Sequence, residues 1–319
     1  MIPRLRFANL PTPVEFLPRL SAELGGPELF VKRDDLTGLA FGGNKTRKLE
    51  FLLAEAQSQG AGSLITAGAV QSNHCRQTAA AAARFGLECI LVLAGDPPPQ
   101  LSANTLLDRL FGAEIVWSAS SERDQVLKQT FDHAWNAGRR PYLIPYGGSS
   151  PTGAAAYALA IQELMEQQFN PDWIVFPTSS GGTQAGMLAG AAIHGYKGKI
   201  LGISVDEPAE ILKARVAGLA QETTDILGHS LALSPDEILV NDGYLGGGYG
   251  VMGENERQAV KLFARSEGLL LDPVYTGRAA GGLVDLVRQG FFSPDQRVLF
   301  WHTGGTPALF ADRYREAFA

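Results

Sequence analysis

Short apolar runs alternate with longer helical patterns along most of the chain, and this alternation most constrains the fold. Helices of ten or more residues between strands are typical of crossover connections, which pair their strands in parallel. We predict strands at 29–31, 63–66, 89–93, 114–117, 141–144, 173–176, 200–205, 238–240, 269–271 and 298–301. We predict helices at 16–24, 76–85, 101–111, 122–137, 153–168, 184–194, 254–266 and 279–289, and one more that begins near Asn44. The sequence therefore predicts an α/β protein with parallel strands flanked by helices.

Composition places the chain among ordinary globular proteins. Its 319 residues suggest about two domains, and 45% hydrophobic with 19% charged residues suffices for a large core. A net charge of −6 without a basic run argues against a nucleic-acid partner. The two cysteines lack metal or redox spacing, and the scattered histidines form no metal motif. No stretch has the length of a signal core or a membrane span, so we expect a cytoplasmic enzyme without a metal.

The segment 32–53 contains the first candidate for chemistry. Two glycines, Gly42 and Gly43, precede a helix for which Asn44 is expected to be the N-cap. Lys45 would then stand at the first helical position, where the positive end of the helix dipole disfavours a charged amine. An uncharged amine can attack a carbonyl to form a Schiff base. Alone, the same pattern also fits a solvated surface lysine.

Two further turns follow predicted strands, at the sheet edge where ligands bind in open α/β folds. The turn 178–183 (TSSGGT) has hydroxyls and backbone amides at a helix start, which suits a small phosphate, but it lacks the lysine of a nucleotide-binding loop. The turn 70–74 (VQSNH) presents Ser72 and Asn73, which could bind a carboxylate. The first turn could equally be an ordinary Gly-rich turn, and the second, taken alone, better fits a plain capping cluster.

Gly248, Gly250 and Gly253 have the GxGxxG spacing of a dinucleotide site. We discount this interpretation because Glu254 would repel a pyrophosphate at the same helix start. The glycines more plausibly allow a tight loop around Tyr249. This tyrosine and Tyr275 both lie in loops, where a hydroxyl can donate or transfer a proton.

Together, the segments FGGNKTRKLE, QSNHCRQTAA, GGTQAG and LLLDPVYTG resemble the signatures of a family of pyridoxal-phosphate (PLP) enzymes with the tryptophan-synthase-β fold. The resemblance is to the group containing D-cysteine desulfhydrase and 1-aminocyclopropane-1-carboxylate (ACC) deaminase, and it covers nearly the whole chain. It implies two open, twisted, mainly parallel sheets flanked by helices. It also implies a larger cofactor-binding domain of residues 1–46 and 153–319, a smaller domain of residues 47–152, and a homodimer.

The resemblance assigns roles residue by residue. Lys45 matches the lysine that holds the cofactor, Asn73 the residue beside the cofactor ring, and Ser72 the hydroxyl near the substrate carboxylate. The matches to the phosphate cup are Ser180, Gly181, Gly182 and Thr183. The matches to the paired active-site tyrosines are Tyr249 and Tyr275.

Thr276 stands where ACC deaminases of this group have a glutamate that faces the pyridine nitrogen. A hydroxyl would not keep that nitrogen protonated as a carboxylate does, which weakens the electron sink. The resemblance therefore implies β-elimination from a small amino acid, with D-cysteine preferred. ACC deaminase and cysteate sulfo-lyase activity remain alternatives, as do a nicotinamide-dependent oxidoreductase and a catalytically silent binding protein. Cys75 is expected to be a small core residue.

Overall fold

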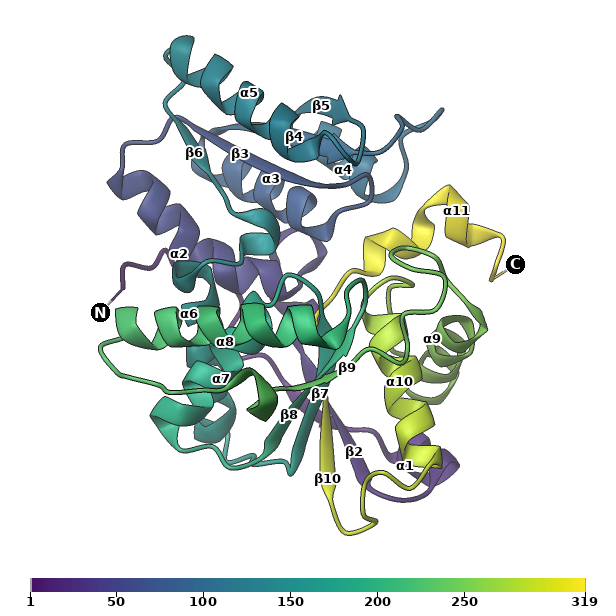
Figure 1. The fold of residues 1–319 in the computed structure, drawn as a ribbon. Coiled ribbons are helices and arrows are strands. Elements are labelled where there is room, and N and C mark those ends of the chain that lie inside the picture. The colour runs from purple at the N-terminus through teal and green to yellow at the C-terminus, as the bar shows by residue number, and fades with distance from the viewer. Residues whose placement is uncertain (1, 319) are drawn as a thin grey trace.

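A computed structural model describes residues 2–318 and contains two sheets, one above the other in Figure 1. The larger sheet has the order β1 (Val14–Phe16), β2 (Glu28–Arg33), β10 (Arg297–His302), β7 (Trp173–Thr178), β8 (Lys199–Ser204) and β9 (Leu239–Asn241). All its neighbouring strands are parallel except the edge strand β1, which is antiparallel to β2. The smaller sheet is wholly parallel, in the order β5 (Glu114–Ser118), β4 (Glu88–Ala94), β3 (Ser63–Ala69) and β6 (Pro141–Leu143). The predicted fold class is confirmed.

Helices cover both faces of each sheet. In chain order they are α1 (Pro18–Leu24), α2 (Asn44–Ser58), α3 (Asn73–Phe85), α4 (Ala103–Leu110), α5 (Arg123–Asn136), α6 (Pro151–Glu166), α7 (Gly182–His194), α8 (Ala209–Ile226), α9 (Glu254–Glu267), α10 (Thr276–Arg288) and α11 (Asp312–Arg315). No helix among residues 2–318 has the length and apolar character needed to cross a membrane.

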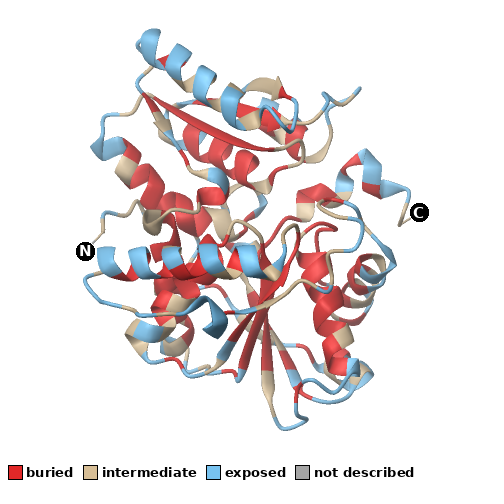
Figure 2. Ribbon diagram, viewed as in Figure 1, coloured by how far each residue is buried: buried red, intermediate tan, exposed pale blue. Residues whose placement is uncertain are grey.

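Alternating side chains of the central strands pack into two separate hydrophobic cores in the larger part of the molecule. In β10, Val298 and Phe300 pack with residues of α1, α9 and α10, whereas Leu299 and Trp301 pack with residues of α6 and α7. Because successive side chains of a strand point to opposite faces, a strand buried on both faces must be apolar throughout. Figure 2 shows these central strands buried along most of their length.

The smaller sheet is built in the same way. Leu64 and Leu91 pack with apolar residues of α2 and α3, and Ile65 and Ile90 pack with Ala134 of α5. Helix α3 is rich in alanine on its buried side, which lets its backbone lie close to the sheet. The strands of the two sheets fall on either side of the predicted domain boundaries, but the boundaries themselves stay a prediction.

Four elements differ from the sequence-based expectation. The predicted strand at 269–271 is wrong: Leu269 and Leu271 are buried in the core, but this short segment only links α9 to α10 and pairs with no strand. Helix α8, the four-residue helix α11 and strand β1 were not predicted. The apolar residues of α8 are diluted by Thr and Gly, and β1 is three residues long, so neither gives a clear periodic signal.

Candidate active site

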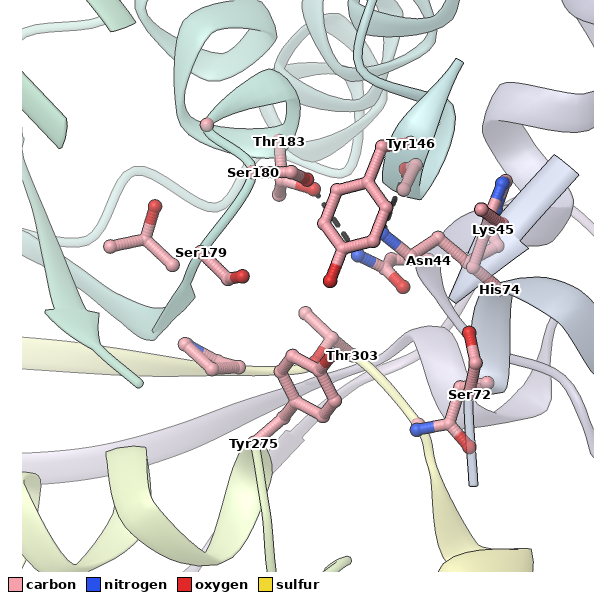
Figure 3. A pocket seen from close by; sticks show the side chains of 17 residues that line it. Asn44, Lys45, Ser72, His74, Tyr146, Ser179, Ser180, Thr183, Tyr275 and Thr303 are labelled. Carbon is pink, nitrogen blue, oxygen red and sulfur yellow. Dashed lines mark hydrogen bonds between the residues drawn. The ribbon is translucent and has the colours of Figure 1, made fainter. Parts of the chain in front are cut away.

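A cavity lies where strands from both sheets reach their carboxyl ends (Figure 3). The segments that follow β3, β7 and β10 all contribute to it, as expected for ligand sites in open parallel sheets. Its lining consists of Asn44, Lys45, Ala67, Ser72, Asn73, His74, Tyr146, Gly147, Pro177, Thr178, Ser179, Ser180, Gly181, Thr183, Tyr275, Thr303 and Gly304. The sequence thus predicted residues that are far apart in the chain and that the fold brings together.

Lys45 is the second residue of α2 and extends to the edge of this cavity. Its Nζ donates a hydrogen bond to the backbone oxygen of Gly147, at 2.8 Å. Burial lowers the pKa of the Lys45 amine to about 8. The sequence predicts that the helix dipole lowers the pKa of this amine. In the structure, the cause of the lowered pKa is the loss of water around the buried amine. The result is an amine that is partly uncharged at neutral pH and can act as a nucleophile.

Asn44 is not the N-cap of α2, so this prediction is wrong. The helix begins at Asn44 itself, its N-cap is Gly43, and no side chain caps it. The backbone amide of Asn44 instead donates to the oxygen of Thr303, at 3.0 Å, and its side-chain Nδ2 donates to Oγ1 of Thr183, at 3.2 Å. Asn44 therefore connects the start of the lysine helix to the first turn of α7 and to the loop that follows β10.

The turn after β7 is the segment for which the sequence predicts an anion site. Gly181 adopts a left-handed conformation with φ of 84°, and α7 begins at Gly182. The amide of Gly182 donates to Oγ of Ser149, at 3.2 Å, and that oxygen lies 2.7 Å from Oγ of Ser180. A Cβ at Gly182 would stand 2.5 Å from the same Ser149 oxygen, so this close approach requires glycine. The free amides of the first turn and the nearby hydroxyls suit a phosphate.

Ser72 and Asn73 mark the start of α3, three residues before the predicted start. Ser72 Oγ accepts a hydrogen bond from the amide of Cys75, at 3.2 Å, which is an ordinary N-cap interaction. Asn73 Oδ1 accepts from Arg76 and Asn104, so its Nδ2 is the atom available to a ligand. Cys75 is fully buried, and burial raises the pKa of its thiol, as expected for a core residue.

The two predicted tyrosines form a pair. The hydroxyls of Tyr249 and Tyr275 lie 2.7 Å apart, and burial raises the pKa of both, so both carry their protons at neutral pH. Only Tyr275 lines the cavity; Tyr249 lines a neighbouring pocket between the loop at 95–102 and the C-terminal segment. A proton on one hydroxyl can be replaced from the other.

Thr276 and Gly182 do not line the cavity. The Thr276 hydroxyl donates to Oδ1 of Asp272 and accepts from the Asp272 amide, both at 2.8 Å. With both roles used, it presents no free hydrogen to a ligand.

Thr303, which follows β10 and was not singled out from the sequence, does line the cavity. The segment 301–307 (WHTGGTP) can be recognised in the sequence as a turn after a strand. The Thr303 hydroxyl in this turn is the signal from which the residue could have been predicted.

The glycine-spaced segment before α9 does not hold an open anion site. The amide of Gly253 donates to Oε2 of Glu256, at 3.0 Å, and Glu256 is buried against Arg278, at 2.7 Å. The helix start is therefore already satisfied by a carboxylate of its own chain.

Three further residues line the cavity to which the sequence gave no role: Tyr146, Ser179 and His74.

Comparisons with known proteins agree with this geometry. The family model described as "Pyridoxal-phosphate dependent enzyme" matches residues 5–304. A crystal structure titled as an ACC deaminase homologue has a TM-score of 0.91 and 38% identity, covering 99% of this chain and 96% of its own. A PLP-dependent aspartate racemase at 18% identity, with a TM-score of 0.68 over 92% of this chain and 90% of its own, shares the fold. The chain therefore belongs to the pyridoxal-phosphate-dependent enzymes, in the group of D-cysteine desulfhydrase and ACC deaminase.

Proposed function

We propose that the enzyme removes sulfide from D-cysteine by β-elimination, releasing pyruvate and ammonia. The observation that supports elimination over ACC ring opening is the composition of the cavity wall. Among the described residues, those that line the cavity include no aspartate or glutamate. Without a carboxylate the cofactor ring nitrogen is not held protonated, so the reaction must have a good leaving group at Cβ. Thiolate is such a group, and a cyclopropane carbon is not.

The residues present fit pyridoxal phosphate. Lys45 supplies the amine, the turn with Ser180 and Gly181 supplies an anion site, and Asn73 Nδ2 supplies a donor for the ring oxygen. A Cβ at Gly147 would stand 2.5 Å from Oγ of Ser180 and 3.3 Å from Nζ of Lys45. Glycine there keeps open the space between the amine and the anion turn, where the cofactor would lie.

When bound, the cofactor supplies a conjugated ring that spreads the negative charge developing at Cα. Lys45 would be the base that removes the Cα proton, because its lowered pKa leaves a lone pair available near neutral pH. Ser72 and the first amides of α3 bind the substrate carboxylate at the helix start. Tyr275 gives its proton to the departing sulfur and takes one from Tyr249, at 2.7 Å.

ACC deaminase and cysteate sulfo-lyase activity are the second candidates, because the ACC deaminase homologue shares 38% identity with this chain. A nicotinamide-dependent reaction gains no support, because Glu256 occupies the glycine-spaced helix start. We further propose that the enzyme is cytoplasmic and acts as a homodimer.

A substrate panel tests the proposal. D-cysteine, L-cysteine, cysteate and ACC are each supplied to the PLP-loaded enzyme, and release of the 2-oxo acid is followed. We expect the largest kcat/KM for D-cysteine, and no turnover with Lys45→Ala. A larger kcat/KM for ACC or cysteate would refute the proposed substrate, while activity in the colourless Lys45→Ala variant would refute the role of the amine.

A further inference from the structure

Arg76 is a buried cation without an ion-pair partner among residues 2–318. It lies in the first turn of α3 with none of its surface exposed, and its Nε has no hydrogen-bond partner. Burial lowers the pKa of its guanidinium only to about 10, so the charge persists at neutral pH. Burying a charge costs folding free energy unless opposite charges or hydrogen bonds compensate it. We therefore looked for the groups that compensate the Arg76 charge.

Two acids lie near Arg76, and neither forms a hydrogen bond to it. Asp272 accepts from three backbone amides and from the Thr276 hydroxyl, so its oxygens are already engaged. Asp108 has no hydrogen-bond partner for either oxygen, and burial raises its pKa to about 8, so it is mostly neutral at pH 7. Asp272 therefore offsets the Arg76 charge through space but without a direct contact, and the guanidinium can also act on other groups close to it.

The hydrogen bonds of Arg76 lead to the cavity. Its Nη1 donates to Oδ1 of Asn73, at 3.1 Å, and to Oδ1 of Asn104, at 2.9 Å. Its Nη2 donates to the backbone oxygen of Gly42, at 3.0 Å, just ahead of the helix that carries Lys45. One guanidinium thus contacts the segments that present both the ring-side amide and the cofactor amine.

Asn104 is the second residue of α4 and does not line the cavity, but it also contacts Asn73. Its Nδ2 donates to Oδ1 of Asn73, at 2.9 Å, and to the backbone oxygen of Gln71, at 2.8 Å. With two donors on Oδ1, the amide of Asn73 cannot rotate by half a turn without losing both bonds. Its Nδ2 makes no hydrogen bond within the described residues, and Asn73 lines the cavity.

We propose that Arg76 and Asn104 are positioning residues that aim the Asn73 amide at the cofactor's ring oxygen, and that the buried Arg76 charge stabilises that oxygen as an anion. The anionic cofactor would then add to the compensation that Asp272 gives Arg76 through space. This inference rests on the proposed placement of Asn73 beside the cofactor ring.

The test follows the visible absorption band of the PLP-loaded enzyme as the pH is raised, without substrate. Arg76→Gln removes the charge and keeps an amide donor, so we expect the cofactor to hold its proton more tightly. The titration midpoint should move to higher pH by about one unit, a tenfold change in proton affinity. Arg139→Gln is the matched control, because it removes one positive charge from a partly exposed site in the same part of the chain. Its midpoint should equal that of the unaltered enzyme.

Asn104→Ala covers the case in which Arg76→Gln fails to fold. It leaves the Arg76 charge but frees one side of Asn73 Oδ1, so we expect a smaller rise in the midpoint. An unchanged midpoint in a folded, PLP-loaded variant at either position would overturn the inference. A shifted midpoint in an enzyme that does not act on D-cysteine would refute only the proposed substrate.

Discussion

The pH dependence of cofactor capture by Lys45 is a direct consequence of the site's burial. With a pKa of about 8, roughly 10% of the amine is uncharged at pH 7. An exposed lysine with its pKa near 10.4 would be only about 0.04% uncharged at that pH. The rate of capture must increase with pH, because only the uncharged amine attacks the aldehyde. The capture rate should therefore rise about tenfold per pH unit below pH 8 and level off above it.

Rapid mixing of cofactor-free enzyme with pyridoxal phosphate, followed by visible absorbance from pH 6.5 to pH 10, measures this profile. Nα-acetyl-lysine is the control, and its rate should keep rising to about pH 10. Lys45→Ala should give no absorbance change beyond that of free cofactor. A profile for the unaltered enzyme that breaks near pH 10, like the control, would show that burial does not lower the pKa of Lys45.

Three substitutions extend the test to other parts of the site. Gly147→Ala forces a Cβ to within 2.5 Å of Ser180 Oγ at a φ of 63°, so we expect a loss of about 1–2 kcal/mol in unfolding free energy and weaker cofactor binding, measured by denaturation and equilibrium dialysis. Tyr275→Phe removes the proton donor and should lower kcat for D-cysteine about 100-fold; an unchanged kcat would remove this tyrosine from the reaction. Thr276→Glu should shift the cofactor spectrum and raise activity on ACC relative to D-cysteine, and identical spectra and preferences would contradict the ring-nitrogen argument.

The parallel architecture could be predicted because buried strands such as 173–176 are apolar throughout and are separated by helix-length segments. The segment 269–271 is equally apolar and equally buried in the core, but it pairs with no strand, which only the tertiary packing decides. Asn44 shows a similar limit at the level of one residue. It has no cap role because α2 already begins at Asn44, and its side chain donates to Thr183, which is distant in sequence.

Loops that carry candidate residues were recognisable from hydroxyls and glycines after strands, and the resemblance to the pyridoxal-phosphate enzymes then assigned Lys45, Ser72 and Ser180 to one site. What sequence could not supply was the direction of each side chain. Thr276 is adjacent to Tyr275 in the chain, yet its hydroxyl turns to Asp272 while the tyrosine reaches the cavity. The network through Arg76 depends on a contact between α3 and α4 that no local pattern encodes.

The central claim is that one amine, and not its neighbour, carries the cofactor. Lys45 and Lys48 both donate to the oxygen of Gly147, at 2.8 Å and 3.3 Å, but only Lys45 lines the cavity. Borohydride reduction of the PLP-loaded enzyme, followed by peptide mass spectrometry, distinguishes them. We predict the added mass on Lys45 alone. An added mass on Lys48, or on no lysine of α2, would contradict the account.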